Sequence, residues 1–165
     1  MTAVATERQT SALALLTPKQ LEGVAATIVS ANKNMENETA VRITDEALKF
    51  LAGAAGATSG KGLFPSKVVD EGWHALILNT ELYADLCSRL GKVIHHVPQV
   101  RAEKGWDRIV VKRTLEAIRA AGYEPDTRLW GKNTDKLIPV AAECMHAECT
   151  PEGGHPDVSP APAVA

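Results

Sequence analysis

Apolar residues recur at intervals of three and four positions in several stretches of the chain, which is the spacing of one face of an α-helix. In the first of these stretches the apolar positions are Leu21, Val24, Ala25, Ile28 and Val29. Thr17, Pro18 and Gln20 stand just before them and form the sequence signature of a helix start, with a capping residue, a proline at the first helical position and a capping-box partner. The pattern predicts a helix over residues 18–31, ended by the polar stretch that follows.

A second helix is predicted to begin at Thr44, because the acidic residues Asp45 and Glu46 suit the positive end of a helix dipole. A glycine-rich connector follows this helix. A third helix is expected to begin at Pro65 or Ser66 and to carry a new apolar stripe.

The stripe of the third helix is expected to bend or to be capped again at Asn79 or Thr80, and the following segment should end at Gly91. A last amphipathic helix is predicted over residues 107–121, with Gly122 as its stop. The turn that follows leads to a short apolar patch at Leu129 and Trp130.

Composition supports a helical fold. Apolar residues make up 45% of the chain, but aromatic residues make up only 4%, and a core of small aliphatic side chains favours packed helices over a sheet sandwich. We therefore expect an all-α protein with a single bundle of four or five helices and disordered termini. The expected divisions are a flexible arm over 1–16, a helical domain over 17–130, and a tail over 131–165 that contains Cys and His and is rich in Pro, Gly and Ala.

Charge and hydropathy exclude some classes of partner. The net charge is −2 with both signs interspersed, which argues against binding to nucleic acid or to an anionic membrane surface. No apolar run is long enough to cross a bilayer, and the N-terminus lacks the pattern of a signal peptide. We expect a cytoplasmic protein whose three cysteines stay reduced.

The candidate chemistry concentrates in residues 68–98. Asp70 and His74 stand four positions apart, so a helix would place them on one face. His95 and His96 follow in a segment that looks extended, where neighbouring side chains point to opposite sides. Asp70, His74 and one or both of these histidines could bind a divalent transition metal such as zinc, or a small ligand together with Tyr83.

Each of these residues also has a purely structural interpretation. A carboxylate that pairs with a buried histidine often holds two helices together without any ligand. Trp73 and Tyr83 could be core residues whose polar tips are satisfied locally. Cys87 could join a metal site, which would favour zinc or copper, but it could equally be a small buried apolar residue.

One run of residues also suggests a family. The positions are Val69-Asp70, Trp73-His74, Leu78, Thr80, Tyr83, Cys87, Gly91 and His95-His96-x-Pro98. This pattern resembles the glycine-rich domain-containing protein-like family, and more closely its small stand-alone bacterial relatives. The similarity is strongest over residues 44–98 and weaker through the segment AIRAAGYEPDTRLW.

The resemblance implies little about activity, but it bears on the candidate ligands. Many relatives have a second histidine at the position of Leu76, which this chain lacks. Four residues can therefore be carried over: Asp70, His74, His95 and His96.

A second group of candidate ligands stands near the C-terminus. Cys144, His146, Cys149 and His155 offer two thiolates and two imidazoles, a donor set that suits tetrahedral zinc. Their spacing matches no standard zinc finger or ribbon. The two cysteines could instead pair under oxidation, or the segment could be an unstructured tail.

Three functions are consistent with these observations. The first is a module that binds a metal or a small ligand in a His/Asp pocket, and this is the interpretation that we adopt. The second is an enzyme in which His74, oriented by Asp70, acts as a general base. The third is an interaction or regulatory scaffold in which the histidines only hold helices together and a protein partner binds elsewhere.

Overall fold

The computed structural model describes residues 8–58, 62–96, 108–131, 134 and 138–140. Two short 3-10 helices, η1 and η2, flank the α-helices near the two ends of this part of the chain. The elements, in chain order, are η1 (Leu13–Leu15), α1 (Pro18–Ala31), α2 (Asn37–Gly56), α3 (Lys67–Leu78), α4 (Thr80–Leu90), α5 (Arg108–Ala120) and η2 (Thr127–Leu129).

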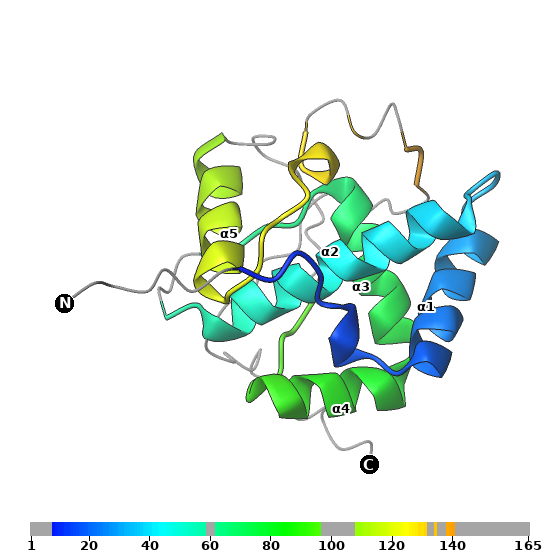
Figure 1. Ribbon diagram of the computed structural model, residues 1–165, viewed down its shortest axis with the longest axis horizontal. Coiled ribbons are helices and arrows are strands. Elements are labelled where there is room, and N and C mark those ends of the chain that lie inside the picture. Colours follow the sequence, from blue (N-terminus) through cyan, green and yellow to red (C-terminus); the bar gives the residue numbers. More distant parts are fainter. Residues whose placement is uncertain (1–7, 59–61, 97–107, 132–133, 135–137, 141–165) are drawn as a thin grey trace, which may run out of the picture.

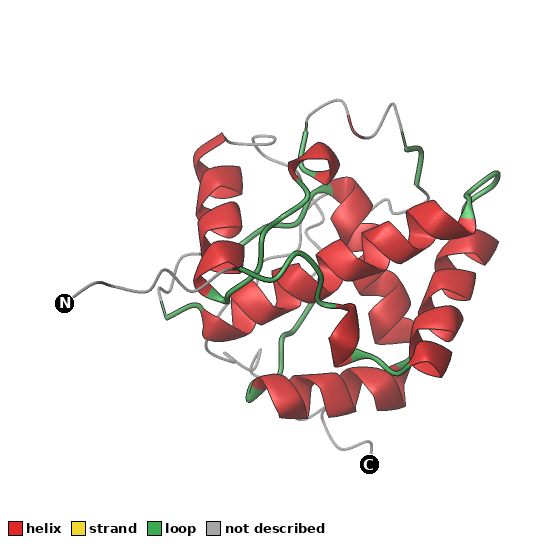
Figure 2. Cartoon of the chain, viewed as in Figure 1, coloured by secondary structure: helices red, strands yellow, loops and turns green. Residues whose placement is uncertain are grey.

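The long helix α2 lies at the centre of the bundle and packs against α1, α3 and α5 (Figure 1). Helix α4 follows α3 directly and packs against it. The described residues contain no β-strand (Figure 2), and Gln9 and Tyr123 form an isolated β-bridge. The all-α prediction is therefore confirmed.

Most predicted helix boundaries are confirmed. The Thr17 hydroxyl accepts from the backbone N–H of Gln20, while the Gln20 side chain accepts from the N–H of Thr17, which completes the predicted capping box at the start of α1. The Ser66 hydroxyl caps α3 by accepting from the backbone N–H of Val69. Gly91 ends α4 in the left-handed region, with a φ of 77° that glycine adopts without strain.

The predicted start of the second helix was wrong. Helix α2 begins at Asn37, seven residues before Thr44, and Glu38 is the acidic residue in its first turn. Asp45 and Glu46 lie in the middle of the helix instead. Their carboxylates make polar contacts with other parts of the fold and do not lie at the positive end of the helix dipole.

Glu46 is fully buried, and both oxygens of its carboxylate accept hydrogen bonds. One oxygen accepts from the indole N–H of Trp130 at 2.6 Å, and the other accepts from the backbone N–H of Asp126 at 3.0 Å and from Lys49 at 3.2 Å. Lys49 is also buried and pairs with Asp45 at 3.0 Å. Burial lowers the pKa of Lys49, but the two carboxylates outweigh it, so that the pKa is raised overall. This network attaches η2 to the middle of α2.

The segment before α1 is packed against the bundle over its described part. An oxygen of Asp45 accepts from the Ser11 hydroxyl at 2.9 Å and from the Ala12 backbone N–H at 2.6 Å. Gln9 exchanges backbone hydrogen bonds with the turn after α5, and Ala12 is 1% exposed. Residues 9–16, which we expected to belong to a flexible arm, are thus held by backbone pairing and by one acidic residue of α2.

Helices α2 and α3 cross closely at Gly72. A Cβ atom added at Gly72 would lie 2.8 Å from the backbone oxygen of Ile43 and 2.9 Å from the Cβ of Ala47. Both distances are shorter than real Cβ contacts. The crossing therefore requires the absence of a side chain at this position, and the functional candidates Asp70 and His74 stand on either side of it.

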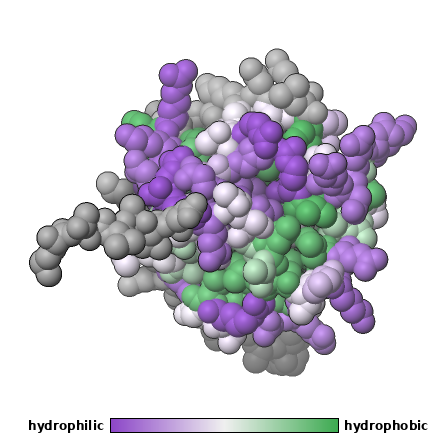
Figure 3. All heavy atoms as spheres, in the orientation of Figure 1, coloured by the Kyte–Doolittle hydropathy of each residue, from purple (hydrophilic) through white to green (hydrophobic). Residues whose placement is uncertain are grey.

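One face of the molecule is mainly polar (Figure 3). Figure 3 shows one face, where apolar side chains gather around η1, between α1 and α4, within largely hydrophilic surroundings. Among the helices that the structure describes, none has both the length and the apolar character needed to span a bilayer.

We predict that Gly72→Ala destabilises the protein by about 1–3 kcal/mol, because the new methyl group must displace backbone atoms of α2. Gly23→Ala is the matched control, since a Cβ there meets nothing within 4 Å. The control should raise the free energy of unfolding by about 0.5–1 kcal/mol through helix propensity alone. Urea denaturation measures both changes, and equal effects of the two variants would contradict the close crossing.

A second prediction concerns Asp126. The hydrogen bond from Arg128 and the further one from Arg42 hold the pKa of Asp126 below its ordinary value of 3.8, although partial burial acts in the opposite direction. A lowered pKa contributes stability above pH 3.8 that is lost as the pH falls below it. Asp126→Asn should therefore lower stability near neutral pH by about 1 kcal/mol and flatten the loss of stability below about pH 4.

Denaturant unfolding at a series of pH values checks the effect of Asp126→Asn. The control is Asp85→Asn, which removes an exposed ion pair with Arg89 on α4 and should change stability by less than about 0.5 kcal/mol. An unchanged acid limb in Asp126→Asn would show that the carboxylate does not stabilise the fold.

Candidate metal centre

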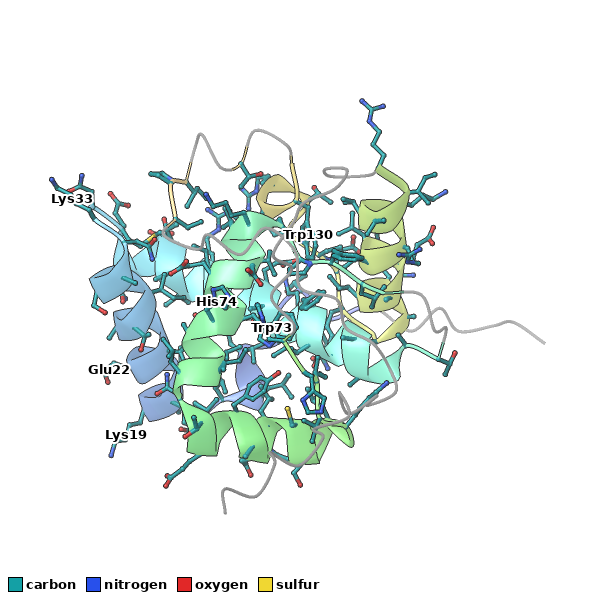
Figure 4. The ribbon with its side chains drawn as sticks, turned by 180° about the vertical axis from the view of Figure 1, so that it is seen from behind. Lys19, Glu22, Lys33, Trp73, His74 and Trp130 are labelled. Carbon is teal, nitrogen blue, oxygen red and sulfur yellow. The ribbon has the colours of Figure 1, made fainter. Side chains whose placement is uncertain are left out.

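Helix α3 carries two of the candidate ligands on one face. Asp70 and His74 are one helical turn apart, and Asp70 Oδ2 lies 3.5 Å from His74 Nε2. The Asp70 side chain is 2% exposed, whereas that of His74 is 28% exposed. In Figure 4, His74 lies on α3 near the middle of the view, with Trp73 beside it, while Lys19, Glu22 and Lys33 lie at the outer edge of the bundle. The site thus has a buried carboxylate below and a partly exposed imidazole at its rim.

The third candidate ligand comes from the segment that follows α4. Exposure alternates along this segment: Val93 is 59% exposed, Ile94 is 3% exposed, His95 is exposed and His96 turns inward. His96 has a side chain only 8% exposed. As the sequence predicts for neighbouring residues in such a segment, one histidine of the doublet faces His74 and the other does not.

The three inward side chains meet in a compact group. His74 Nε2 lies 2.8 Å from His96 Nε2, and His96 Nε2 lies 3.0 Å from Asp70 Oδ1. Within the described ranges, Asp70, His74 and His96 are the group of potential metal ligands whose donor atoms all lie within 4.8 Å of one another. His74 and His96 are 22 residues apart in the sequence, so their contact joins α3 to the segment after α4.

Hydrogen bonds within this group do not satisfy all of its polar atoms. A single N–H on His96 Nε2 can point at Asp70 Oδ1 or at His74 Nε2, but it cannot serve both well. Asp70 Oδ2 is buried and makes no hydrogen bond, and an unpaired buried carboxylate oxygen is costly. The cluster therefore contains more acceptor lone pairs than the N–H groups of the described side chains satisfy.

The spacing of the donor atoms matches that of a metal site. Two ligand atoms of a tetrahedral zinc ion lie about 3.3 Å apart, because each is about 2.0–2.1 Å from the ion. The contacts of 2.8, 3.0 and 3.5 Å lie on both sides of that value. Two imidazoles and a carboxylate are also a donor set that transition metals accept.

Tyr83 makes two hydrogen bonds beside this group. Its hydroxyl accepts from the indole N–H of Trp73 at 2.9 Å and donates to the backbone oxygen of Ile94 at 2.5 Å. The polar tips of Trp73 and Tyr83 thus satisfy each other, as the structural interpretation anticipated. What the sequence analysis missed is the contact with Ile94, which ties this pair to the segment that carries His96.

Cys87 does not contribute a ligand atom to this group. It is a free thiol and is 3% exposed. The C-terminal candidates Cys144, His146, Cys149 and His155 lie outside the described residues.

Comparison with known proteins places the chain in a family. The UCP032817-like family matches residues 15–115, more than half of the chain. The chain belongs to the UCP032817-like family. The matched range contains Asp70, His74 and His96 together with α1 to α4. No curated protein and no solved structure matches the chain.

The family match corrects the resemblance drawn from the sequence. The chain does not belong to the glycine-rich domain-containing protein-like family, although the run from Val69 to Pro98 resembles it. Several of those positions have structural roles in this bundle. Gly91 ends α4, and the side chains of Trp73 and Tyr83 hydrogen-bond to each other.

Proposed function

We propose that this UCP032817-like protein binds a divalent transition-metal ion through Asp70, His74 and His96. The observation that carries the proposal is the buried oxygen Oδ2 of Asp70, which lacks a hydrogen bond beside two imidazole nitrogens only 2.8 Å apart. A cation between these atoms would neutralise the carboxylate and use the lone pairs of both Nε2 atoms at once.

Three protein ligands leave coordination positions for water or a small ligand. The carboxylate and His96 lie at the buried side of the group, and His74 is its most exposed member. The free positions of an ion held there would face the rim formed by His74. This arrangement is typical of sites that exchange ligands more than of closed structural sites.

The donor set also restricts the class of metal. Imidazole nitrogen suits zinc, iron, nickel and copper, whereas magnesium and calcium prefer all-oxygen sites. Since the group offers no thiolate, it gives no preference for Cu(I). We therefore expect binding of Zn²⁺ or of a neighbouring first-row divalent ion.

We predict that metal-free protein binds one equivalent of Zn²⁺ at this site, and that Asp70→Asn, His74→Ala and His96→Ala each weaken binding at least about 10-fold. Isothermal titration calorimetry with Zn²⁺ measures the affinity, and Co²⁺ absorption spectra report the geometry. All proteins should carry Cys144→Ser and Cys149→Ser, so that the C-terminal thiols do not contribute.

The matched control is His95→Ala, which removes an exposed imidazole next to a proposed ligand. It should bind Zn²⁺ like the parent protein. A saturating ion should also raise the melting temperature of the parent, by the equivalent of about 2.7 kcal/mol at a concentration 100 times Kd, but not that of His74→Ala. A parent protein that binds none of Zn²⁺, Fe²⁺, Ni²⁺ and Cu²⁺ would contradict the proposal and leave the cluster as a link between α3 and the segment after α4.

A further inference from the structure

Over its described part, the segment that carries His96 is joined to the helices before it by a small number of named contacts. The segment that carries it has left α4 at Gly91, and its described residues 92–96 belong to no helix. Among these residues, Ile94 is buried and its backbone oxygen accepts the hydrogen bond from Tyr83. This bond is made two residues before His96, on the same buried side of the segment.

Tyr83 is in turn held from α3. Its hydroxyl accepts from the indole N–H of Trp73, and Trp73 is fully buried next to His74 in sequence. The Trp73 ring also lies against the His96 ring, with centroids 4.6 Å apart. Two consecutive hydrogen bonds, from Trp73 to Tyr83 and from Tyr83 to Ile94, therefore connect α3, which has two of the proposed ligands, to the segment that has the third.

We infer that Tyr83 is a positioning residue for the metal site, which holds His96 at the ion without touching the ion itself. This inference rests on the proposed function for its consequence in metal affinity. The hydroxyl is the chemical group that does this, because it is the atom that links the indole of Trp73 to the backbone of Ile94. The ring alone would pack in the same place without fixing the segment.

The geometry explains why one hydroxyl can matter at a distance. Asp70 and His74 are placed by the backbone of one helix and stay within reach of each other in any case. His96 is brought by a non-helical segment, so its imidazole has to be ordered before three ligands can bind one ion. Loss of that order raises the entropy cost of binding, and groups that orient ligands typically contribute 10–100-fold to metal affinity.

The test compares Tyr83→Phe with Tyr123→Phe in the full chain carrying the two cysteine substitutions. Tyr123 is a tyrosine of similar partial burial that lies next to the turn after α5 and pairs with Gln9 through its backbone. We expect Tyr83→Phe to bind Zn²⁺ about 10-fold or more weakly, and Tyr123→Phe to bind it like the parent.

A second measurement needs no metal. In the metal-free protein, the ring current of Trp73 should shift the NMR signals of the His96 ring protons, which are assigned by their loss in His96→Asn. Tyr83→Phe should move these signals toward the values of a free histidine, at temperatures where circular dichroism shows the variant to be folded. If the variant does not fold in buffer, both measurements are made in sucrose, which favours the folded state.

Loss of both the shifted signals and the Zn²⁺ affinity in Tyr83→Phe supports the inference. Unchanged His96 signals overturn it, whether or not the affinity falls, because a positioning role requires His96 to move. If the parent protein binds no Zn²⁺ but Tyr83→Phe still loses the shifted signals, the proposed function fails and the positioning role of Tyr83 stands. Equal changes in Tyr83→Phe and Tyr123→Phe overturn the inference as well.

Discussion

The close crossing of α2 and α3 is the constraint on which the rest of the structure depends. Helix α2 is the element against which α1, α3 and α5 all pack, and at Gly72 the backbone of α3 meets that of α2 with no room for a side chain. This contact sets the depth of α3 in the bundle. Asp70, two residues away, is therefore buried instead of lying at the surface, where most carboxylates are found.

Two of the buried carboxylates on these crossing helices, those of Glu46 and Asp70, differ in their hydrogen bonding. Glu46 on α2 accepts hydrogen bonds from an indole, a backbone N–H and a lysine, so both of its oxygens are hydrogen-bonded. Asp70 on α3 has two imidazoles near it, and one of its oxygens accepts no hydrogen bond. This unpaired oxygen of Asp70 is the observation on which the proposed metal ion rests.

The sequence predicted the helices whose ends have local signals. The capping box at Thr17, the cap at Ser66 and the stop at Gly91 are each written in a few neighbouring residues, so their positions follow without knowledge of the fold. The start of α2 could not be found in this way, because Asp45 and Glu46 resemble a helix start. Their carboxylates instead contact Ser11, Lys49 and Trp130. The contacts with Ser11 and Trp130 join residues far apart in the chain and leave no local pattern.

The candidate site shows the same division. The pairing of Asp70 with His74 follows from their helical spacing. Because neighbouring side chains alternate in direction along a non-helical segment, the sequence also predicts that only one of His95 and His96 faces His74. The sequence alone could not show which histidine turns inward, since the inward side chain contacts Asp70 and His74, which lie more than 20 residues earlier in the chain.

The site is assembled mainly by two consecutive helices and the segment after them. Asp70 and His74 come from α3, the anchoring Tyr83 comes from α4, and His96 comes five residues after the glycine that ends α4. All of these residues lie within the range that matches the UCP032817-like family, whereas Trp130, which completes the pairing of Glu46, lies beyond it. The three donor atoms and the tryptophan that completes the pairing of Glu46 therefore come from different parts of the chain.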